Sequence, residues 1–228
     1  MQQLFVHIGT HKTGTTSLQA YLMDHRRQLR RDGVAVCTEK HRKFGEIANC
    51  FALAHSVLRP GLMTVSRLTG DARKPGFWGD AKAFAHMAKL LSDKRAAGFV
   101  LSAEAFCFAR TESEFAKIKR LLCSWGMEVR PIVCFRDAQT WRDSWFAQIS
   151  KYQRQFQNAF GDGLDDIRED WYFDTQEILR FWNRIGPVSV VDYDEAVARD
   201  GTVIPALLGA MEMREYAGSE GYFLNPSQ

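Results

Sequence analysis

The fold is decided by residues 4–22, which read Leu-Phe-Val-His-Ile-Gly-Thr-His-Lys-Thr-Gly-Thr-Thr-Ser-Leu-Gln-Ala-Tyr-Leu. An apolar run over residues 4–8 leads into a loop rich in glycine and threonine, and apolar residues return at helical spacing from Leu18 onward. This order predicts a buried strand, a short loop and the start of a helix. Free backbone N–H groups and the positive end of the helix dipole would then meet at the loop, so we expect the loop to bind an anion.

The loop differs from the phosphate-binding loop of nucleoside triphosphatases in the position of its lysine. Counting from Gly9, the pattern G-x-x-x-x-G-K-[ST] is met at Gly14, but Thr15 occupies the position of the lysine. The lysine of this loop is Lys12, two residues before Gly14. A phosphate bound in the loop would therefore be contacted by Lys12 from a different side than by the lysine of a nucleoside triphosphatase.

Residues 11–17, His-Lys-Thr-Gly-Thr-Thr-Ser, resemble the 5′-phosphosulfate-binding loop of sulfotransferases. The longer segment Gly-Thr-His-Lys-Thr-Gly-Thr-Thr-Ser-Leu-Gln is similar to the bacterial branch of that family. The resemblance implies a P-loop NTPase-like sulfotransferase fold, with 3′-phosphoadenosine 5′-phosphosulfate (PAPS) as donor, adenosine 3′,5′-bisphosphate (PAP) as product, and no metal. It also implies that the donor is held by residues of the loop: Lys12, Thr13, Gly14, Thr15, Thr16 and Ser17. An ordinary strand-to-helix turn rich in Gly and Thr is the simpler alternative.

The resemblance also implies roles within the loop. The backbone amides of residues 12–17 and the hydroxyls of Thr15 and Thr16 would hold the 5′-phosphosulfate. Lys12 would neutralise the charge that develops on the bridging oxygen as its bond to sulfur breaks, which is a catalytic role. His7, in the strand before the loop, is expected instead to be a satisfied core residue.

The composition is that of a globular protein. The chain has 228 residues, 46% hydrophobic and 25% charged, which suits one α/β domain over residues 1–228. The net charge of +3 gives no case for nucleic acid. Five cysteines without a Cys-x-x-Cys pair indicate reduced thiols and no metal site, and no apolar stretch is long enough to span a membrane. With no room for a signal peptide before the first predicted strand, we expect a cytoplasmic protein.

Strands and helices are predicted to alternate along the chain. The predicted strands cover residues 4–8, 34–37, 99–102, 129–135 and 187–192. The predicted helices cover residues 16–31, 44–58, 80–97, 112–125, 138–156 and 171–185. This alternation predicts a single-domain three-layer α/β sandwich with a parallel, doubly wound sheet. Two long irregular segments, 59–79 and 158–170, are expected to frame the acceptor pocket.

Basic residues are concentrated between residues 26 and 43. A solvated helix face with its following turn is the interpretation we prefer for such a run. A surface that attracts an acidic acceptor is the alternative.

A second set of residues indicates a nucleotide with two phosphate groups. The predicted strand over residues 129–135 is followed by Arg136, and Ser144 comes eight residues later on the next predicted helix. An arginine at the carboxyl end of a strand, with a hydroxyl on the succeeding helix, can bind a second phosphate at the same edge of the sheet. The spacing is similar to the 3′-phosphate-binding element of sulfotransferases, although Ala138 and Gln139 replace the proline that the family often has there. A simple ion pair between Arg136 and a carboxylate is the alternative.

Transfer of a sulfuryl group to a hydroxyl needs a base that accepts the hydroxyl proton. Glu104 lies just past the predicted strand over residues 99–102, at the edge that faces the ligand crevice in an open α/β sheet. Carbohydrate sulfotransferases of this resemblance use a glutamate in a comparable place, so we favour a carbohydrate-like alcohol, on a small molecule or a glycan, as acceptor. His11, beside Lys12 in the loop, is the rival base. A carboxylate that merely caps the following turn is the structural alternative for Glu104.

The end of the last predicted strand keeps two further functions open. Asp192 there resembles a Walker B carboxylate, so a P-loop ATP-dependent small-molecule kinase would place magnesium at this residue. The same stretch resembles the Tyr-Glu-Asp segment that follows a late strand in sulfotransferases, and without the Walker lysine we prefer this second interpretation. A non-catalytic nucleotide-binding module is the third possibility. Sulfotransferases usually have a late basic loop that closes on the nucleotide, and only Arg214 stands in such a place here.

Overall fold

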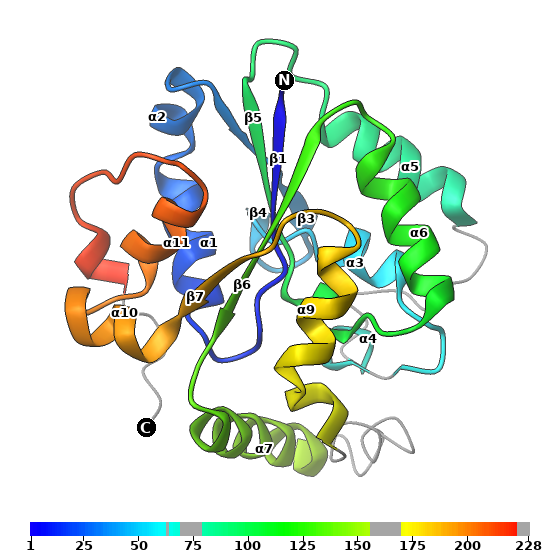
Figure 1. Ribbon diagram of the computed structural model, residues 1–228, viewed down its shortest axis with the longest axis vertical. Coiled ribbons are helices and arrows are strands. Elements are labelled where there is room, and N and C mark those ends of the chain that lie inside the picture. The colour runs from blue at the N-terminus through cyan, green and yellow to red at the C-terminus, as the bar shows by residue number, and fades with distance from the viewer. Residues whose placement is uncertain (63, 69–78, 156–169, 223–228) are drawn as a thin grey trace.

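The chain folds around one parallel sheet (Figure 1). The structure is a computed structural model that describes residues 1–62, 64–68, 79–155 and 170–222. The five strands of the sheet have the order β2-β5-β1-β6-β7, and every neighbouring pair is parallel. They are β1 (Gln3–His7), β2 (Val34–Val36), β5 (Gly98–Ser102), β6 (Glu128–Phe135) and β7 (Ser189–Asp192). The predicted α/β fold with a parallel sheet is therefore confirmed.

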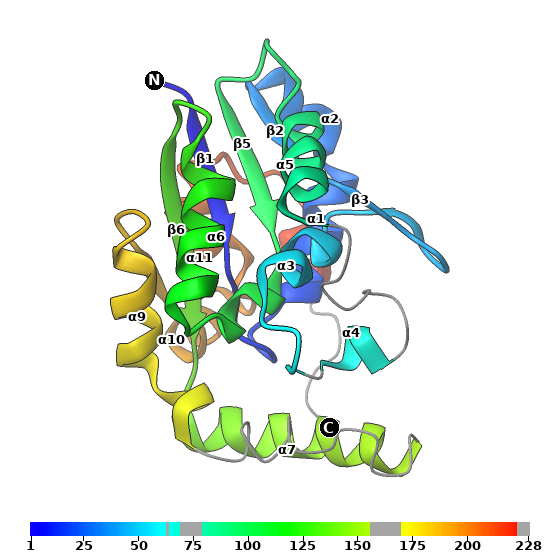
Figure 2. The same cartoon turned by 90° about the vertical axis from the view of Figure 1, so that its right-hand side faces the viewer.

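Helices flank this sheet on both faces (Figure 1 and Figure 2). One face packs against α1 (Thr15–Asp24), α2 (Arg26–Arg31), α10 (Tyr193–Asp200) and α11 (Ile204–Ala210). The other face packs against α3 (Phe51–Val57), α5 (Gly79–Leu90), α6 (Glu112–Cys123) and α9 (Thr175–Asn183). Alternation along β1 produces the two faces, because Leu4 and Val6 belong to the core under α6 and α9, whereas Phe5 belongs to the core under α1 and α11.

A two-stranded hairpin stands apart from the main sheet (Figure 2). It consists of β3 (Glu39–His41) and β4 (Gly45–Ile47), which pair antiparallel. The prediction of one helix over residues 44–58 is therefore wrong in its first part, which forms β4. Gly45 has a φ angle of 71°, which suits the turn of a hairpin. The Glu39 carboxylate accepts the N–H groups of Ala52 and Leu53 at 2.8 and 3.0 Å, and these bonds cap the first turn of α3.

The predicted helix over residues 16–31 is broken at His25, which separates α1 from α2. The His25 ring stacks on Tyr21, with ring centres 4.2 Å apart, and on Tyr216 at 5.5 Å. Its Nδ1 atom lies 3.1 Å from the Tyr21 carbonyl oxygen, within hydrogen-bonding distance. A side chain that bonds a helical carbonyl perturbs the helix. Because Tyr216 also holds the His25 ring, a contact with a distant segment helps to decide where α1 ends.

The remaining elements are α4 (Val65–Leu68), α7 (Ala138–Gln155) and the 3₁₀ helices η1 (Glu104–Phe108), η2 (Asp170–Phe173) and η3 (Ser219–Tyr222). The sequence predicted no element after residue 192, where α10, α11 and η3 form. Residues 69–78 of one predicted irregular segment, and residues 158–169 of the other, lie outside the described residues. No described helix is both long and apolar enough to span a membrane.

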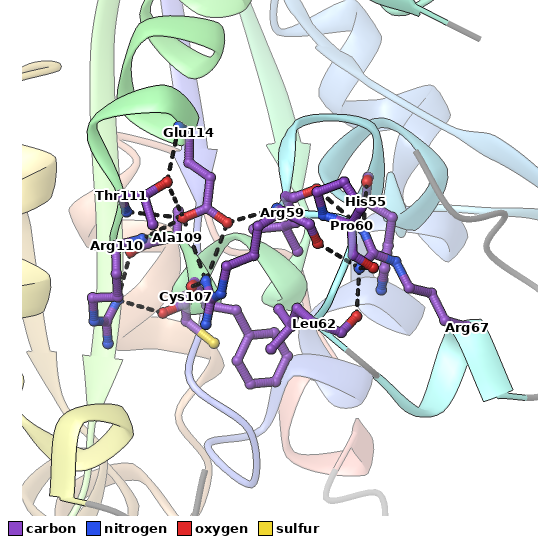
Figure 3. Close-up of polar contacts among 12 residues, drawn as sticks. His55, Arg59, Pro60, Leu62, Arg67, Cys107, Ala109, Arg110, Thr111 and Glu114 are labelled. Atoms are coloured by element: carbon purple, nitrogen blue, oxygen red, sulfur yellow. Dashed lines mark hydrogen bonds and ion pairs between the residues drawn. The ribbon is translucent and has the colours of Figure 1, made fainter. Parts of the chain in front are cut away.

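The segment after α3 is held in place by Arg67 (Figure 3). The guanidinium of this buried residue donates to carbonyl groups at and beyond the end of α3, those of His55, Leu58, Arg59 and Leu62. Glu114, in the first turn of α6, accepts the N–H groups of Arg59, Arg110 and Thr111. Carbonyl groups at a helix C-terminus lack partners within the helix, so the Arg67 bonds supply the missing ones. Together with Glu114 they tie this segment to α6.

Candidate functional site

The directions of the strand connections create a crevice at the carboxyl end of β1. The chain leaves β1 toward α1 on one face of the sheet. It leaves β5 toward α6 and β6 toward α7, whose buried residues belong to the core on the other face. Ligands of open α/β sheets bind where neighbouring connections diverge in this way. The loop over residues 9–14 lies at this position, between β1 and α1.

The backbone of this loop is left-handed at three positions. Gly9, Lys12 and Gly14 have φ angles of 37°, 69° and 79°. At Gly14 an added Cβ would lie 2.5 Å from Cγ1 of Val203, the N-cap residue of α11, so only glycine fits without displacing that side chain. Lys12 is the unfavourable position, because residues with a side chain are disfavoured at positive φ. Strain of this kind is concentrated in functional loops.

Buried hydroxyl groups attach the loop to the sheet. Thr10 Oγ1 donates to the Cys134 carbonyl of β6 at 2.6 Å, and Thr13 Oγ1 donates to the Thr10 carbonyl at 2.6 Å. Thr15 Oγ1 lies 3.4 Å from the same Thr10 carbonyl. The hydroxyls of Thr13 and Thr15 are thus bonded within the protein. Of the two hydroxyls expected to hold the phosphosulfate, that of Thr15 is buried and that of Thr16 is exposed at the start of α1.

The first turn of α1 offers backbone N–H groups to a ligand. Gly14 is its N-cap residue, and no side chain caps the helix there. The first bond within the helix runs from the Leu18 N–H to the Gly14 carbonyl at 3.0 Å. The amides of residues 15–17 precede that bond and lie at the positive end of the helix dipole, so they can bind an anion. The Ser17 side chain is buried.

Arg136 reaches the loop from the end of β6. Its Nη1 donates to the Lys12 carbonyl at 3.3 Å, and its guanidinium carbon lies 5.0 Å from the centre of the Tyr193 ring. The ion pair with Asp194 is long, at 4.0 Å, so a neighbouring carboxylate neutralises Arg136 only weakly. The side chain is 9% exposed, and its Nε has no hydrogen-bond partner among the described residues. The structure thus brings Arg136 and Lys12 together.

Ser144 lies two turns into α7 and is partly buried. Trp141 and Trp145, on the same side of this helix, are buried in the core. No hydrogen bond joins Ser144 to Arg136 in the described part of the chain. Arg136 therefore lies at the end of the strand and Ser144 on the helix that follows it, with no hydrogen bond between these two described residues.

Glu104 begins η1, two residues after the end of β5. Shielding from solvent raises the pKa of its carboxyl to about 7, while a hydrogen bond from the Thr15 hydroxyl and the charge of Lys12 act in the opposite direction. A carboxyl group with this pKa changes protonation state near neutral pH, which suits a general base. The structure therefore places Glu104 within reach of the loop and its lysine.

His11 is enclosed by aromatic side chains. Its ring centre lies 4.9 Å from that of Phe108 and 4.3 Å from that of Trp145, and its Nδ1 forms a short hydrogen bond with the Tyr172 hydroxyl. Burial lowers the pKa of His11 to about 3, and nearby positive charge, including that of Lys12, acts in the same direction. An imidazole with so low a pKa is a weak proton acceptor at neutral pH.

His7 lies beneath the loop and is satisfied on one side of its ring only. Its Nδ1 is 2.9 Å from the Ser102 hydroxyl oxygen, which also accepts the Gln19 amide at 3.1 Å. Its Nε2 has no partner among the described residues, although the side chain is fully buried and burial lowers its pKa to about 4. A Cβ added to Gly9 would lie 3.1 Å from the His7 ring, so the loop covers the histidine closely. His7 is therefore a core residue, as expected, but only its Nδ1 has a hydrogen-bond partner among the described residues.

The sequence did not predict three residues that contact the site: Gln19, Tyr172 and Tyr193. Tyr193 offered a signal, since it directly follows the last predicted strand. The other two offered none, because Tyr172 is 161 residues from its partner His11 and Gln19 is 83 residues from Ser102. Contacts across such separations are decided by the fold.

Asp192, the magnesium ligand of the kinase alternative, is the N-cap residue of α10. Its Oδ1 accepts the N–H of Glu195 at 2.8 Å. Within the described ranges, no group of three or more His, Cys, Asp and Glu side chains gathers as a metal site. The carboxylate of Asp192 therefore has a structural role in starting α10.

Fold and geometry define an α/β protein with a candidate anion-binding site where its first strand leads into its first helix. The chain matches no protein-family model, and no curated protein is significantly similar to it. The functional assignment therefore depends on the residues gathered at the carboxyl end of β1.

Proposed function

We propose that the protein is a sulfotransferase, which moves a sulfuryl group from PAPS to a hydroxyl of an acceptor. The observation that carries the proposal is the meeting of Glu104, Lys12 and the uncapped first turn of α1 at one edge of the sheet. These supply a base, a cation and an anion-binding backbone, which the transfer needs. The resemblance of residues 11–17 to the phosphosulfate loop supports the same function.

The donor would lie along the carboxyl edge of the sheet, as in a P-loop NTPase-like sulfotransferase fold. The amides of residues 15–17 and the exposed hydroxyl of Thr16 would bind the 5′-phosphosulfate. Arg136 would bind the 3′-phosphate, since its guanidinium is nearly buried, has an unpartnered Nε and is only weakly neutralised. Ser144 would join it from α7 once the nucleotide lies between them.

Glu104 acts as the base in the proposed reaction. It takes the proton of the acceptor hydroxyl while the hydroxyl oxygen attacks sulfur in line. A new S–O bond forms to the acceptor, the S–O bond to the nucleotide breaks, and its electron pair stays on the phosphate oxygen of PAP. Lys12 neutralises the charge on that oxygen. A pKa of about 7 leaves Glu104 partly ionised at neutral pH and still basic enough to accept a proton.

Glu104 has better support as the base than His11. Burial disfavours the charged form of any group, so it moves the two pKa values in opposite directions. The carboxyl pKa rises to about 7, and the imidazole pKa falls to about 3. Because the His11 ring is also bonded to Tyr172, we assign His11 to the packing of the loop against η2.

Calorimetric titration with PAP and, separately, with ATP and magnesium tests the donor site. We expect PAP to bind and the Arg136→Ala variant to weaken that binding about 30-fold, as for a lost charged hydrogen bond to phosphate. Arg130→Ala is the matched control, since Arg130 lies on the same strand but pairs with Glu212 at 2.7 Å, far from the loop.

Three other results would contradict the proposal. Preference for ATP with magnesium would replace it by the kinase alternative. Binding of PAP without turnover of any acceptor would indicate a non-catalytic nucleotide-binding module. Binding of neither nucleotide would reduce the loop over residues 9–14 to a structural turn.

A further inference from the structure

A pocket of about 350 Å³ lies beside the candidate site. Its walls come from α1, the hairpin of β3 and β4, the segment that leads into α3, and α4. Thr16 lines this pocket and also carries the exposed hydroxyl at the start of α1. The volume is in the usual range for small-molecule sites. The pocket and the anion-binding turn of α1 are therefore neighbours that share Thr16.

The pocket is attached to the strand that leads to Glu104. Gln19 lines the pocket, and its side-chain amide donates to the Ser102 hydroxyl at 3.1 Å. The Cys50 N–H donates to the Ser102 carbonyl at 2.8 Å, and Cys50 directly follows Asn49 in the pocket wall. Ser102 is the last residue of β5, two residues before Glu104. Two walls of the pocket are thus bonded to the end of the strand that precedes the proposed base.

One wall of the pocket is aromatic. The His41 ring stacks on Phe44 with ring centres 4.8 Å apart and meets the edge of Phe51 at 5.6 Å. Phe44 is 72% exposed, so its ring is available to a ligand. Apolar side chains continue this wall (Ala20, Met23, Ile47 and Ala48), and the polar residues of the lining are Thr16, Gln19, Asn49 and Ser66. Flat apolar rings complement such a wall, whereas most hydroxyls of a sugar would lose water there without gaining partners.

The pocket opens onto the anion-binding turn at Thr16. Asn49 also lines the pocket, but its Oδ1 is buried and has no hydrogen-bond partner among the described residues, so it does not face the open pocket. Thr16 is exposed at the start of α1 and lines the pocket. A single hydroxyl on the bound molecule would therefore lie close to Thr16.

Two basic residues lie between the lining residues His41 and Phe44 in the hairpin turn, and we call this pair the basic lip of the pocket. Arg42 and Lys43 occupy the hairpin turn next to Phe44, and both are exposed. The Lys43 N–H bonds to Nδ1 of His41 at 3.1 Å, so the turn and the aromatic wall form one unit. Neither Arg42 nor Lys43 forms an ion pair with a described residue. Two such charges beside an apolar wall favour a ligand that has an anionic group at one end.

We infer that this pocket binds the acceptor, and that the acceptor is a ring-containing hydroxy acid with apolar rings, one hydroxyl and one carboxylate. The rings would lie along the aromatic wall, the hydroxyl toward Thr16, and the carboxylate toward Arg42 and Lys43. The role as acceptor rests on the proposed sulfuryl transfer, whereas the binding of such a compound does not. This class replaces the carbohydrate-like alcohol suggested by the glutamate base, because the surface of the pocket is mainly apolar.

The first test measures the binding of small aromatic ligands to the nucleotide-free protein by fluorescence titration. We expect 6-hydroxy-2-naphthoate to bind, and 2-naphthol, which lacks the carboxylate, to bind about tenfold more weakly. Glucuronate, which has the carboxylate but no apolar rings, is expected not to bind detectably. Equal or tighter binding of glucuronate, or no binding of the naphthoate, would overturn the inference.

Variants of exposed residues locate the site without disturbing the fold. Phe44→Ala should weaken binding of the naphthoate about tenfold. Arg42→Glu with Lys43→Glu should weaken the naphthoate about tenfold and leave 2-naphthol unchanged. Arg27→Glu with Arg31→Glu is the matched control, because these exposed residues of α2 do not line the pocket. If the control pair had an equal effect, the loss of affinity would be due to the overall charge of the protein. This result would contradict the placement of the carboxylate beside Arg42 and Lys43.

Titration of the same protein with PAP separates the two proposals. Binding of the naphthoate without PAP would keep the ligand class of the pocket and remove its role as an acceptor site. Binding of PAP without the naphthoate would keep the donor site and overturn the inference about the pocket. If both bind, Phe44→Ala should raise the KM for the naphthoate in sulfuryl transfer and leave the affinity for PAP unchanged.

Discussion

The loop over residues 9–14 and the hairpin over residues 39–47 both lie beside the first turn of α1, but their side chains are enclosed to different extents. In the loop, Thr10 and Thr13 are fully buried and bond backbone carbonyls at 2.6 Å. In the hairpin, Phe44 is 72% exposed, and Arg42 and Lys43 are exposed as well. The loop therefore presents a preformed backbone, while the hairpin leaves its side chains available. This difference suits a constant nucleotide on one side and a particular acceptor on the other.

The largest expected effect concerns chemistry at the loop. Glu104→Gln should lower kcat about a thousandfold, since it removes the proposed proton acceptor and keeps the shape of the side chain. Affinity for PAP should change little. The kcat/KM of the unaltered protein should rise with pH through about 7, because the base must be ionised and the pKa of Glu104 is about 7. Steady-state kinetics from pH 5.5 to 8.5 (about three pH units around that value) measure both effects.

Glu112→Gln is the matched control for this prediction. Glu112 is an exposed carboxylate of α6 that pairs with Arg184 at 2.6 Å, away from the loop. It should retain full turnover and the same pH profile. If Glu104→Gln also retained turnover, the base would have to be sought elsewhere, first at His11.

The second prediction compares a glycine of the loop with a glycine of the hairpin. Gly14→Ala should lower the free energy of unfolding by about 3 kcal/mol, because it combines a left-handed φ with a clash against Val203. Gly45→Ala has a similar φ of 71° but meets no atom within 4 Å, so it should lose only about 1 kcal/mol. Urea denaturation measures both values. Adding Val203→Ala should relieve part of the Gly14→Ala loss; equal losses for the two glycines would show that the close packing has no effect.

The third prediction compares two threonines in the same pair of regions. Thr10→Val should destabilise the fold by about 2 kcal/mol, since it leaves the buried Cys134 carbonyl without its donor. Thr38→Val removes an exposed bond to Glu46 at 2.7 Å and should change stability by less than about 0.5 kcal/mol. Thermal unfolding of the two variants tests this order. A reversed order would contradict the view that the loop is the rigid region.

The smallest expected effect concerns the pH dependence of stability. The folded pKa of Glu104 is raised above its ordinary value of 4.5, so ionisation of this group weakens the fold as pH rises through the interval from 4.5 to about 7. Glu104→Gln cannot ionise and should be more stable than the unaltered protein at pH 8, by about 1–2 kcal/mol. The difference should vanish near pH 4.5. Denaturation at both pH values provides the measurement. If the variant were less stable at pH 8, burial of the ionised Glu104 carboxylate would not destabilise the fold.

Local patterns predicted the parts of the molecule that depend on short stretches of chain. The strand, loop and helix of residues 4–22 form as expected, because apolar runs, glycine positions and helical spacing act over a few residues. The parallel sheet followed from the alternation of strands and helices. The expected proximity of Arg136 and Glu104 to the loop also followed, since parallel strands present their carboxyl ends at one edge.

The failures share one physical cause, which is interaction with distant residues. Phe44 to Val57 reads as one amphipathic helix, but Glu39 and the hairpin turn redirect its first part. The break at His25 accompanies stacking on Tyr216, which no local pattern shows. Propensity is a weak prior that tertiary contacts override.

The sequence by itself determined the loop, its displaced lysine and the five strands of the main sheet, because each depends on residues close together in the chain. Only the tertiary structure distinguished the two candidate bases, since the pKa of Glu104 and that of His11 depend on burial. It alone formed the pocket beside Thr16, whose walls come from four separate segments. Protonation and cavity shape are properties of the packed molecule. A sequence motif can therefore indicate candidate residues, but their pKa values and the shape of the pocket depend on the tertiary structure.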